Sequence, residues 1–75
     1  MPKLPIVSAR IFLKVLKKKG FVHHRTSGSH HVYIRQSDQT TVSVPVHVGH
    51  DLGRGLLGSL LKNAGIPVDE FLRLK

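Results

Sequence analysis

The sequence contains no cysteine among its 75 residues. This absence excludes a disulfide framework, a thiolate nucleophile and a zinc site built on thiolates. A chain of this length is expected to form one domain, so residues 1–75 are predicted to fold around one layered core. Because such a small domain has no room for a cavity walled on all sides, we expect a surface site and no cofactor.

Carboxylates are also scarce, since the chain has only Asp38, Asp51, Asp69 and Glu70. Asp38 and Asp51 fall in separate predicted loops, and Asp69 and Glu70 are neighbours that face different directions on a helix. The magnesium ions of nucleases need oxygen ligands that converge, usually at least two carboxylates. The sequence therefore predicts no metal site and no metal-dependent nuclease.

No long apolar run is present either. The first residues, Met1 to Pro5, lead into no stretch that is long enough for a signal peptide or a membrane span. We therefore expect no membrane partner and a cytoplasmic location.

What is present predicts two main helices separated by strands. Ser8 is suited to cap a helix that runs to about Lys19, where Gly20 ends it, because apolar residues recur at helical spacing from Ala9 onward. A second helix is predicted from about Gly55 to residue 64. Strands are predicted over 21–25, 30–35 and 41–45, with turns at 26–29 and 36–40, a loop over 46–54 and closing helical turns over 68–74.

This order predicts an α+β two-layer sandwich, α-β-β-β-α, with a three-stranded antiparallel sheet and a short C-terminal helical tail. Each helix carries one apolar stripe to bury, so both helices must cover the same face of the sheet. The other sheet face is then open to a ligand or partner, and a short exposed strand edge leaves room for a homodimer.

The charge of the chain points to a polyanionic partner. Lysine and arginine number 12 against 4 acidic residues, which gives a net charge of +8 and a pI near 10.7. A basic stripe of this kind is typical of nucleic-acid binding. On the first helix, Lys14, Lys17 and Lys18 gather with Arg10 opposite the apolar stripe, and no acidic residue lies four positions away to neutralise them. We expect these lysines to contact phosphates.

Six histidines supply the chemistry that the carboxylates lack. Imidazole can accept and return a proton near neutral pH, and RNA carries its own nucleophile in the 2′-hydroxyl. A ribonuclease needs little more than a positioned base or acid and cations for the developing charge. A zinc site made by His47, His50 and a strand histidine is an alternative, but its signal is weak without cysteine.

The stretch Gly28-Ser29-His30-His31 lies where a turn enters the middle strand, and its glycine lets a phosphate approach the backbone. Strand alternation places His31, Tyr33 and Arg35 on one face and His30 on the other, at the rim of the sheet. On the preceding strand, His23 and Arg25 are predicted to share a face. Tyr33 has two interpretations of similar weight: its ring stacks on a base, or it covers the sheet.

Several motifs in order resemble the HicA (YcfA-like) toxin family over nearly the whole chain. They are Gly20-Phe21, Gly28-Ser29-His30-His31, Val42-Ser43-Val44-Pro45-Val46-His47, Asp51-Leu52, Gly55-Leu56-Leu57, Leu60-Leu61-Lys62-Asn63-Ala64-Gly65-Ile66 and Val68-Asp69-Glu70-Phe71. The G-S-H and V-P-x-H elements are specific together and weak singly.

The resemblance implies a fold similar to the double-stranded-RNA-binding domain and an mRNA-cleaving toxin that a cognate HicB-type antitoxin holds inactive. It places the catalytic histidine at His30, with His31 in reserve because some relatives carry the histidine one place later. It gives His47 no assigned role. The chain departs from the pattern at His50 and Asp51, where relatives often have lysine and glutamate, and at Leu56, where many have threonine.

The sequence therefore predicts a metal-independent endoribonuclease, an mRNA interferase, and the alternative is an RNA-binding module without catalysis. The predicted RNA contacts are Lys14, Lys17, Lys18, Arg25, Gly28, Ser29, Tyr33 and Arg35. A DNA-binding regulator is the weakest hypothesis, because the whole sheet separates the two helices and no helix-turn-helix pair is visible.

Overall fold

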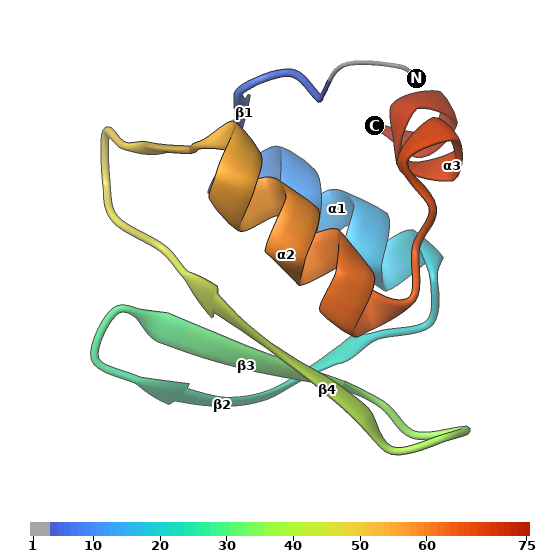
Figure 1. Ribbon diagram of the computed structural model, residues 1–75. Coiled ribbons are helices and arrows are strands. Elements are labelled where there is room, and N and C mark those ends of the chain that lie inside the picture. Colours follow the sequence, from blue (N-terminus) through green and yellow to red (C-terminus); the bar gives the residue numbers. More distant parts are fainter. Residues whose placement is uncertain (1–3) are drawn as a thin grey trace.

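In a computed structural model, which describes residues 4–75, two helices and a short third one lie on one side of a twisted three-stranded antiparallel sheet (Figure 1). The predicted α+β class and the helix-first order are confirmed. The elements are β1 (Val7–Ser8), α1 (Ala9–Lys18), β2 (Val22–Ser27), β3 (His30–Arg35), β4 (Thr40–Pro45), β5 (Asp51–Leu52), α2 (Arg54–Ala64) and α3 (Val68–Leu74).

Helix α1 begins and ends close to where its sequence pattern predicts. The Ser8 side chain accepts a hydrogen bond from the Ile11 backbone N–H at 3.3 Å, which satisfies one of the free N–H groups of the first turn. Its apolar side, with Phe12, Val15 and Leu16, is buried, while the lysines of its other side are exposed. The helix therefore has the core face and the cationic face that the sequence indicates.

Strands β2 and β3 form a tight hairpin whose two-residue turn is Gly28-Ser29. Ser27 pairs with His30, and Gly28 has a φ of 59°. A glycine with positive φ at the first central position matches a type II′ turn, whose twist suits a two-residue hairpin. The turn thus fixes His30 as the first residue of β3, and β3 lies between β2 and β4 in the sheet.

A β-bulge at His24 changes which residues of β2 point to each face of the sheet. His23 pairs with Tyr33 and Arg25 pairs with Val32, so His24 is an extra residue in the strand. Tyr33 and Val32 are adjacent on β3 and point to opposite faces, and the paired β2 residues follow them. The prediction that His23 and Arg25 share a face is wrong for this reason.

A second small sheet lies in a segment predicted to be only a loop. Val7 pairs with Leu52 and Ser8 with Asp51, and both Val7 and Leu52 are buried. A further hydrogen bond, from Arg54 Nε to the Leu4 carbonyl at 2.8 Å, holds the same segment. These contacts fix the start of α1 against the end of the 46–52 connection.

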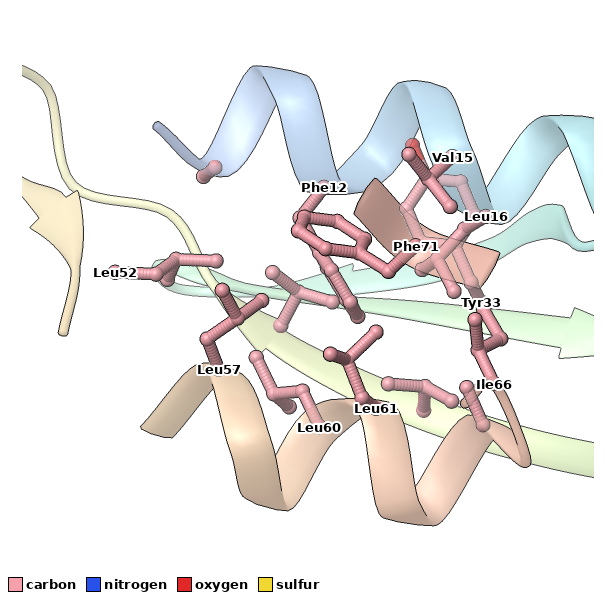
Figure 2. Close-up of a cluster of buried hydrophobic side chains, with 14 of the residues drawn as sticks. Phe12, Val15, Leu16, Tyr33, Leu52, Leu57, Leu60, Leu61, Ile66 and Phe71 are labelled. Atoms are coloured by element: carbon pink, nitrogen blue, oxygen red, sulfur yellow. The ribbon is translucent and has the colours of Figure 1, made fainter. Parts of the chain in front are cut away.

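The core lies between the helices and the inner face of the sheet, and aromatic and aliphatic side chains fill it (Figure 2). Helix α2 contributes Leu57, Leu60 and Leu61 and ends at Gly65 in the left-handed conformation. From α3, Phe71 is fully buried, with its ring centre 6.3 Å from that of Phe12. Among residues 4–75, no helix combines the length and the apolar character that a bilayer span requires.

Candidate functional site

The Gly28-Ser29 turn places His30 at an exposed corner of the sheet. His30 is exposed, and the carbonyl of Ser29 accepts a hydrogen bond from the Val46 backbone N–H at 2.7 Å. This bond holds the end of β4 against the turn. A Cβ built on Gly28 would meet no atom within 4 Å, so the space above this part of the backbone is open.

The register of the sheet assigns His30 to the face that the helices leave uncovered. His30 pairs with Ser27 and Pro45, and Arg25 pairs with Val32 two residues further along β3. Residues that pair directly point to the same face, so His30 and Arg25 share the open face as diagonal neighbours. The structure thereby brings an exposed imidazole and an exposed guanidinium to one surface.

His31, the second histidine of the doublet, faces the helices. It pairs with Thr26 and with the fully buried Val44, and its own side chain is half-buried. Its ring centre lies 6.0 Å from that of His23. The His23 Nε2 forms a 2.7 Å hydrogen bond with Thr26 Oγ1. The two candidates for the catalytic histidine therefore occupy opposite faces of the sheet.

Tyr33 lies on the same inner face, and its side chain is packed among the core residues (Figure 2). It is only 5% exposed, and the His23 ring stands edge-on to its ring at 5.5 Å between centres. A base cannot stack on a ring that is covered in this way. Of the two interpretations of Tyr33, covering the sheet is the one that the structure supports, and we remove it from the RNA contacts.

Arg35 is engaged in contacts within the protein. Its Nε and Nη2 donate to the two carboxylate oxygens of Asp38 at 3.1 and 2.8 Å, and its guanidinium carbon lies 4.8 Å from the centre of the Phe21 ring. The hydrogen bonds from Arg35, with a further one from Thr40, hold the pKa of Asp38 well below its usual range. An arginine with both partners in place is poorly suited to the phosphate contact predicted for it.

The cationic side of α1 borders a groove of about 720 Å³. Its lining consists of Arg10, Leu13, Lys14, Lys17, Lys18 and Val46. Leu13 and Val46 are partly packed against the core and give the groove an apolar floor. Lys18 Nζ donates to the Leu74 carbonyl at 2.9 Å, whereas no ion pair within residues 4–75 engages Lys14 or Lys17. One lining residue of the groove, Val46, is hydrogen-bonded through its backbone N–H to the Ser29 carbonyl of the turn before His30.

A second depression lies between the start of α1 and the connection that follows β4. Its lining includes Arg10, His47, His50 and Asp51. His47 Nε2 is 3.5 Å from Ser29 Oγ, and the rings of His47 and His50 are 6.2 Å apart between centres. The V-P-x-H spacing singled out His47, but only the fold shows that it reaches the turn before His30.

The alternative zinc site, with His47, His50 and a strand histidine, finds no matching arrangement. Within the described part of the chain, no three histidine, aspartate or glutamate side chains come together as a set that could hold a metal ion. His23 and His31 lie on the inner face of the sheet, and His47 and His50 lie on the connection after β4. The histidines are thus spread over separate surfaces.

Comparison with known families identifies the family of the chain. The family model described as the HicA toxin of bacterial toxin–antitoxin systems matches residues 9–66, from the start of α1 to just beyond α2. Among curated proteins, no match is found. The matched span contains the Gly28-Ser29 turn, His30, His47 and the cationic side of α1.

Proposed function

The chain belongs to the HicA toxin family, whose members are toxins of toxin–antitoxin systems, and from this we propose that it is an endoribonuclease acting on messenger RNA. The proposed reaction is a metal-independent transesterification in which histidine moves protons. The family also implies a cognate antitoxin, and we propose that this partner is of the HicB type. A small, acidic reading frame directly beside the gene would support that pairing.

The observation that carries the proposal is the placement of His30. It stands exposed directly after a glycine-containing turn, on the open sheet face that it shares with Arg25. In the proposed reaction His30 removes the proton of the ribose 2′-hydroxyl, and Arg25 neutralises charge that builds on the phosphate. Positioned proton transfer typically contributes about 10²- to 10⁴-fold in rate, and oxyanion stabilisation adds to it.

The groove beside α1 supplies the binding part of the proposal. Lys14 and Lys17 present ammonium groups along it that no ion pair within residues 4–75 engages, and Arg10 and Lys18 add positive charge. We propose that the RNA backbone follows this groove, passes Val46 and crosses the Gly28-Ser29 turn to reach His30. The backbone N–H groups of such a turn are suited to a phosphate oxygen.

A non-catalytic RNA-binding module remains the second candidate, because a cationic groove of this kind binds RNA without any chemistry. Incubation of end-labelled RNA with the purified protein in excess EDTA separates the two functions. The ribonuclease proposal predicts fragments with 2′,3′-cyclic phosphate and 5′-hydroxyl ends, formed at the same rate with and without the chelator. Intact RNA that nevertheless binds, with an affinity that falls as salt increases, would support the passive module instead.

A further inference from the structure

We propose that His47 is a second catalytic residue of this ribonuclease and acts as the proton donor opposite His30. The inference rests on the proposed function, since it assigns the other half of the same reaction. Neither the family match nor the sequence pattern gives His47 a role. Its position in the fold does.

Three contacts place His47 beside the site. His30 pairs with Pro45 in the sheet, and the next residue, Val46, donates its backbone N–H to the Ser29 carbonyl at 2.7 Å. His47 follows directly and turns its ring back, so that its Nε2 lies 3.5 Å from the Ser29 hydroxyl. The imidazoles of His30 and His47 thus come from the two chain segments that border the Gly28-Ser29 turn.

Both imidazoles are accessible to a substrate. His30 and His47 are exposed, and His47 lines a depression of about 380 Å³. The contact between His47 and Ser29 is long for a hydrogen bond, so the ring can exchange that partner for a phosphate ester oxygen. A phosphodiester bound at the turn would therefore lie near both His30 and His47.

RNA transesterification needs both groups. The 2′-oxygen forms a bond to phosphorus while its proton passes to His30, and the bond from phosphorus to the 5′-oxygen breaks while that oxygen takes a proton from His47. The products are a 2′,3′-cyclic phosphate and a 5′-hydroxyl, and no electrons are exchanged with a cofactor. A departing alkoxide is a poor leaving group, so a positioned acid is expected to accelerate this step by about 10²- to 10⁴-fold.

The charged groups around His47 are consistent with this role. Arg10 lines the same depression from α1, and Asp51 and His50 line it from the segment after the turn at 48–49. The ring of His50 is 6.2 Å from that of His47, and the His50 backbone N–H donates to the His47 carbonyl at 3.1 Å. Arg10 adds a positive charge beside the position where the phosphate would lie.

His50 provides a matched control. It is an exposed histidine in the same depression as His47, but no hydrogen bond in the described structure joins its ring to the turn before His30. If His47→Ala lost cleavage only because positive charge or local structure is lost, His50→Ala should lose as much cleavage. A loss of cleavage in His47→Ala that His50→Ala does not share would indicate that His47 donates a proton.

The test compares His30→Ala, His47→Ala, His47→Gln and His50→Ala with the wild type on two substrates. One is an RNA whose cleavage site has been mapped with the wild type. The other is the same RNA with sulfur in place of the 5′-oxygen at that site, because a thiolate leaves without a proton. We expect His47→Ala and His47→Gln to lose roughly 100-fold or more on the oxygen substrate and to stay near wild type on the sulfur substrate.

The pH profile gives an independent readout. The donor must be protonated, so the wild-type rate should fall at high pH, and this fall should be absent from the His47 variants on either substrate. Equal losses on both substrates, or a His47→Ala rate that matches that of His50→Ala, would overturn the inference. If His30→Ala cleaves the RNA as fast as the wild type does, the proposed function itself is contradicted. The failure of the inference and the failure of the proposed function are therefore distinguishable.

Discussion

Arg35 and Asp38 are joined by two hydrogen bonds across the start of the β3–β4 connection, and the same guanidinium lies over the ring of Phe21. A side chain added at Gly20 or Gly65, which follow α1 and α2, would come within about 4 Å of the Arg35 side chain. The Arg35 side chain therefore lies near the ends of both main helices. These contacts engage Arg35 within the fold and leave it poorly suited to bind a phosphate.

The Asp38 pair should give the protein a pH-dependent part of its stability. Because hydrogen bonds from Arg35 and Thr40 lower the pKa of Asp38 in the folded state, the paired carboxylate stabilises the fold above the ordinary carboxyl pKa. This contribution is lost as pH falls toward the lowered value. We expect Asp38→Asn to lower the thermal midpoint at pH 7, and the difference from wild type to shrink below about pH 4.

Thermal unfolding of both proteins between pH 2.5 and 7 measures this difference. Asp51→Asn is the control, since no side-chain hydrogen bond or ion pair within residues 4–75 involves Asp51. A gap between wild type and Asp38→Asn that stays constant down to pH 2.5 would contradict the assigned role of the pair.

Helix α3 lies beyond the matched span of 9–66, yet it should be essential to stability. Phe71 is fully buried against Phe12, and removing a buried phenylalanine side chain typically costs about 3–5 kcal/mol. We expect Phe71→Ala to lose that much free energy of unfolding in urea titrations. Arg73→Ala, an exposed change on the same helix, should cost less than about 1 kcal/mol. Similar losses in the two variants would refute the packing of α3 described above.

The groove beside α1 makes a prediction about RNA affinity. Replacing Lys14 or Lys17 by alanine should weaken binding of single-stranded RNA and reduce the slope of log affinity against log salt by about 0.7 for each phosphate that the variant no longer neutralises. Fluorescence anisotropy at several salt concentrations gives both quantities. Lys62→Ala, an exposed lysine on α2 outside the groove, should leave the slope unchanged. An unchanged slope in all three variants would place the RNA elsewhere.

Much of this fold follows from local patterns in the sequence. The bounds of α1 and β3 could be predicted because apolar periodicity, a capping serine and flanking glycines act within a few residues of one another. The open position of His30 also follows from strand alternation combined with its place at the first position of β3. These features depend on neighbours in the chain.

Other features depend on partners that are distant in the chain. The bulge at His24 exists because β2 and β3 pair in a particular register, and nothing local to His23 or Arg25 indicates that they part to opposite faces. The pairing of Val7 with Leu52 joins two-residue strands that are too short to leave a period in the sequence. His47 and Ser29 are also distant in the chain, so their approach appears only in the fold.

The central claim is that His30 and not His31 carries the proposed cleavage, and the two single alanine variants test it most directly. RNA cleavage in EDTA should fall by about 10²- to 10⁴-fold in His30→Ala, while RNA affinity stays within a few-fold of wild type. His31 lies on the helix side of the sheet. Compared at equal concentrations of folded protein, His31→Ala should therefore retain most of the wild-type cleavage rate. Full cleavage by His30→Ala, or a catalytic loss confined to folded His31→Ala, would contradict the account.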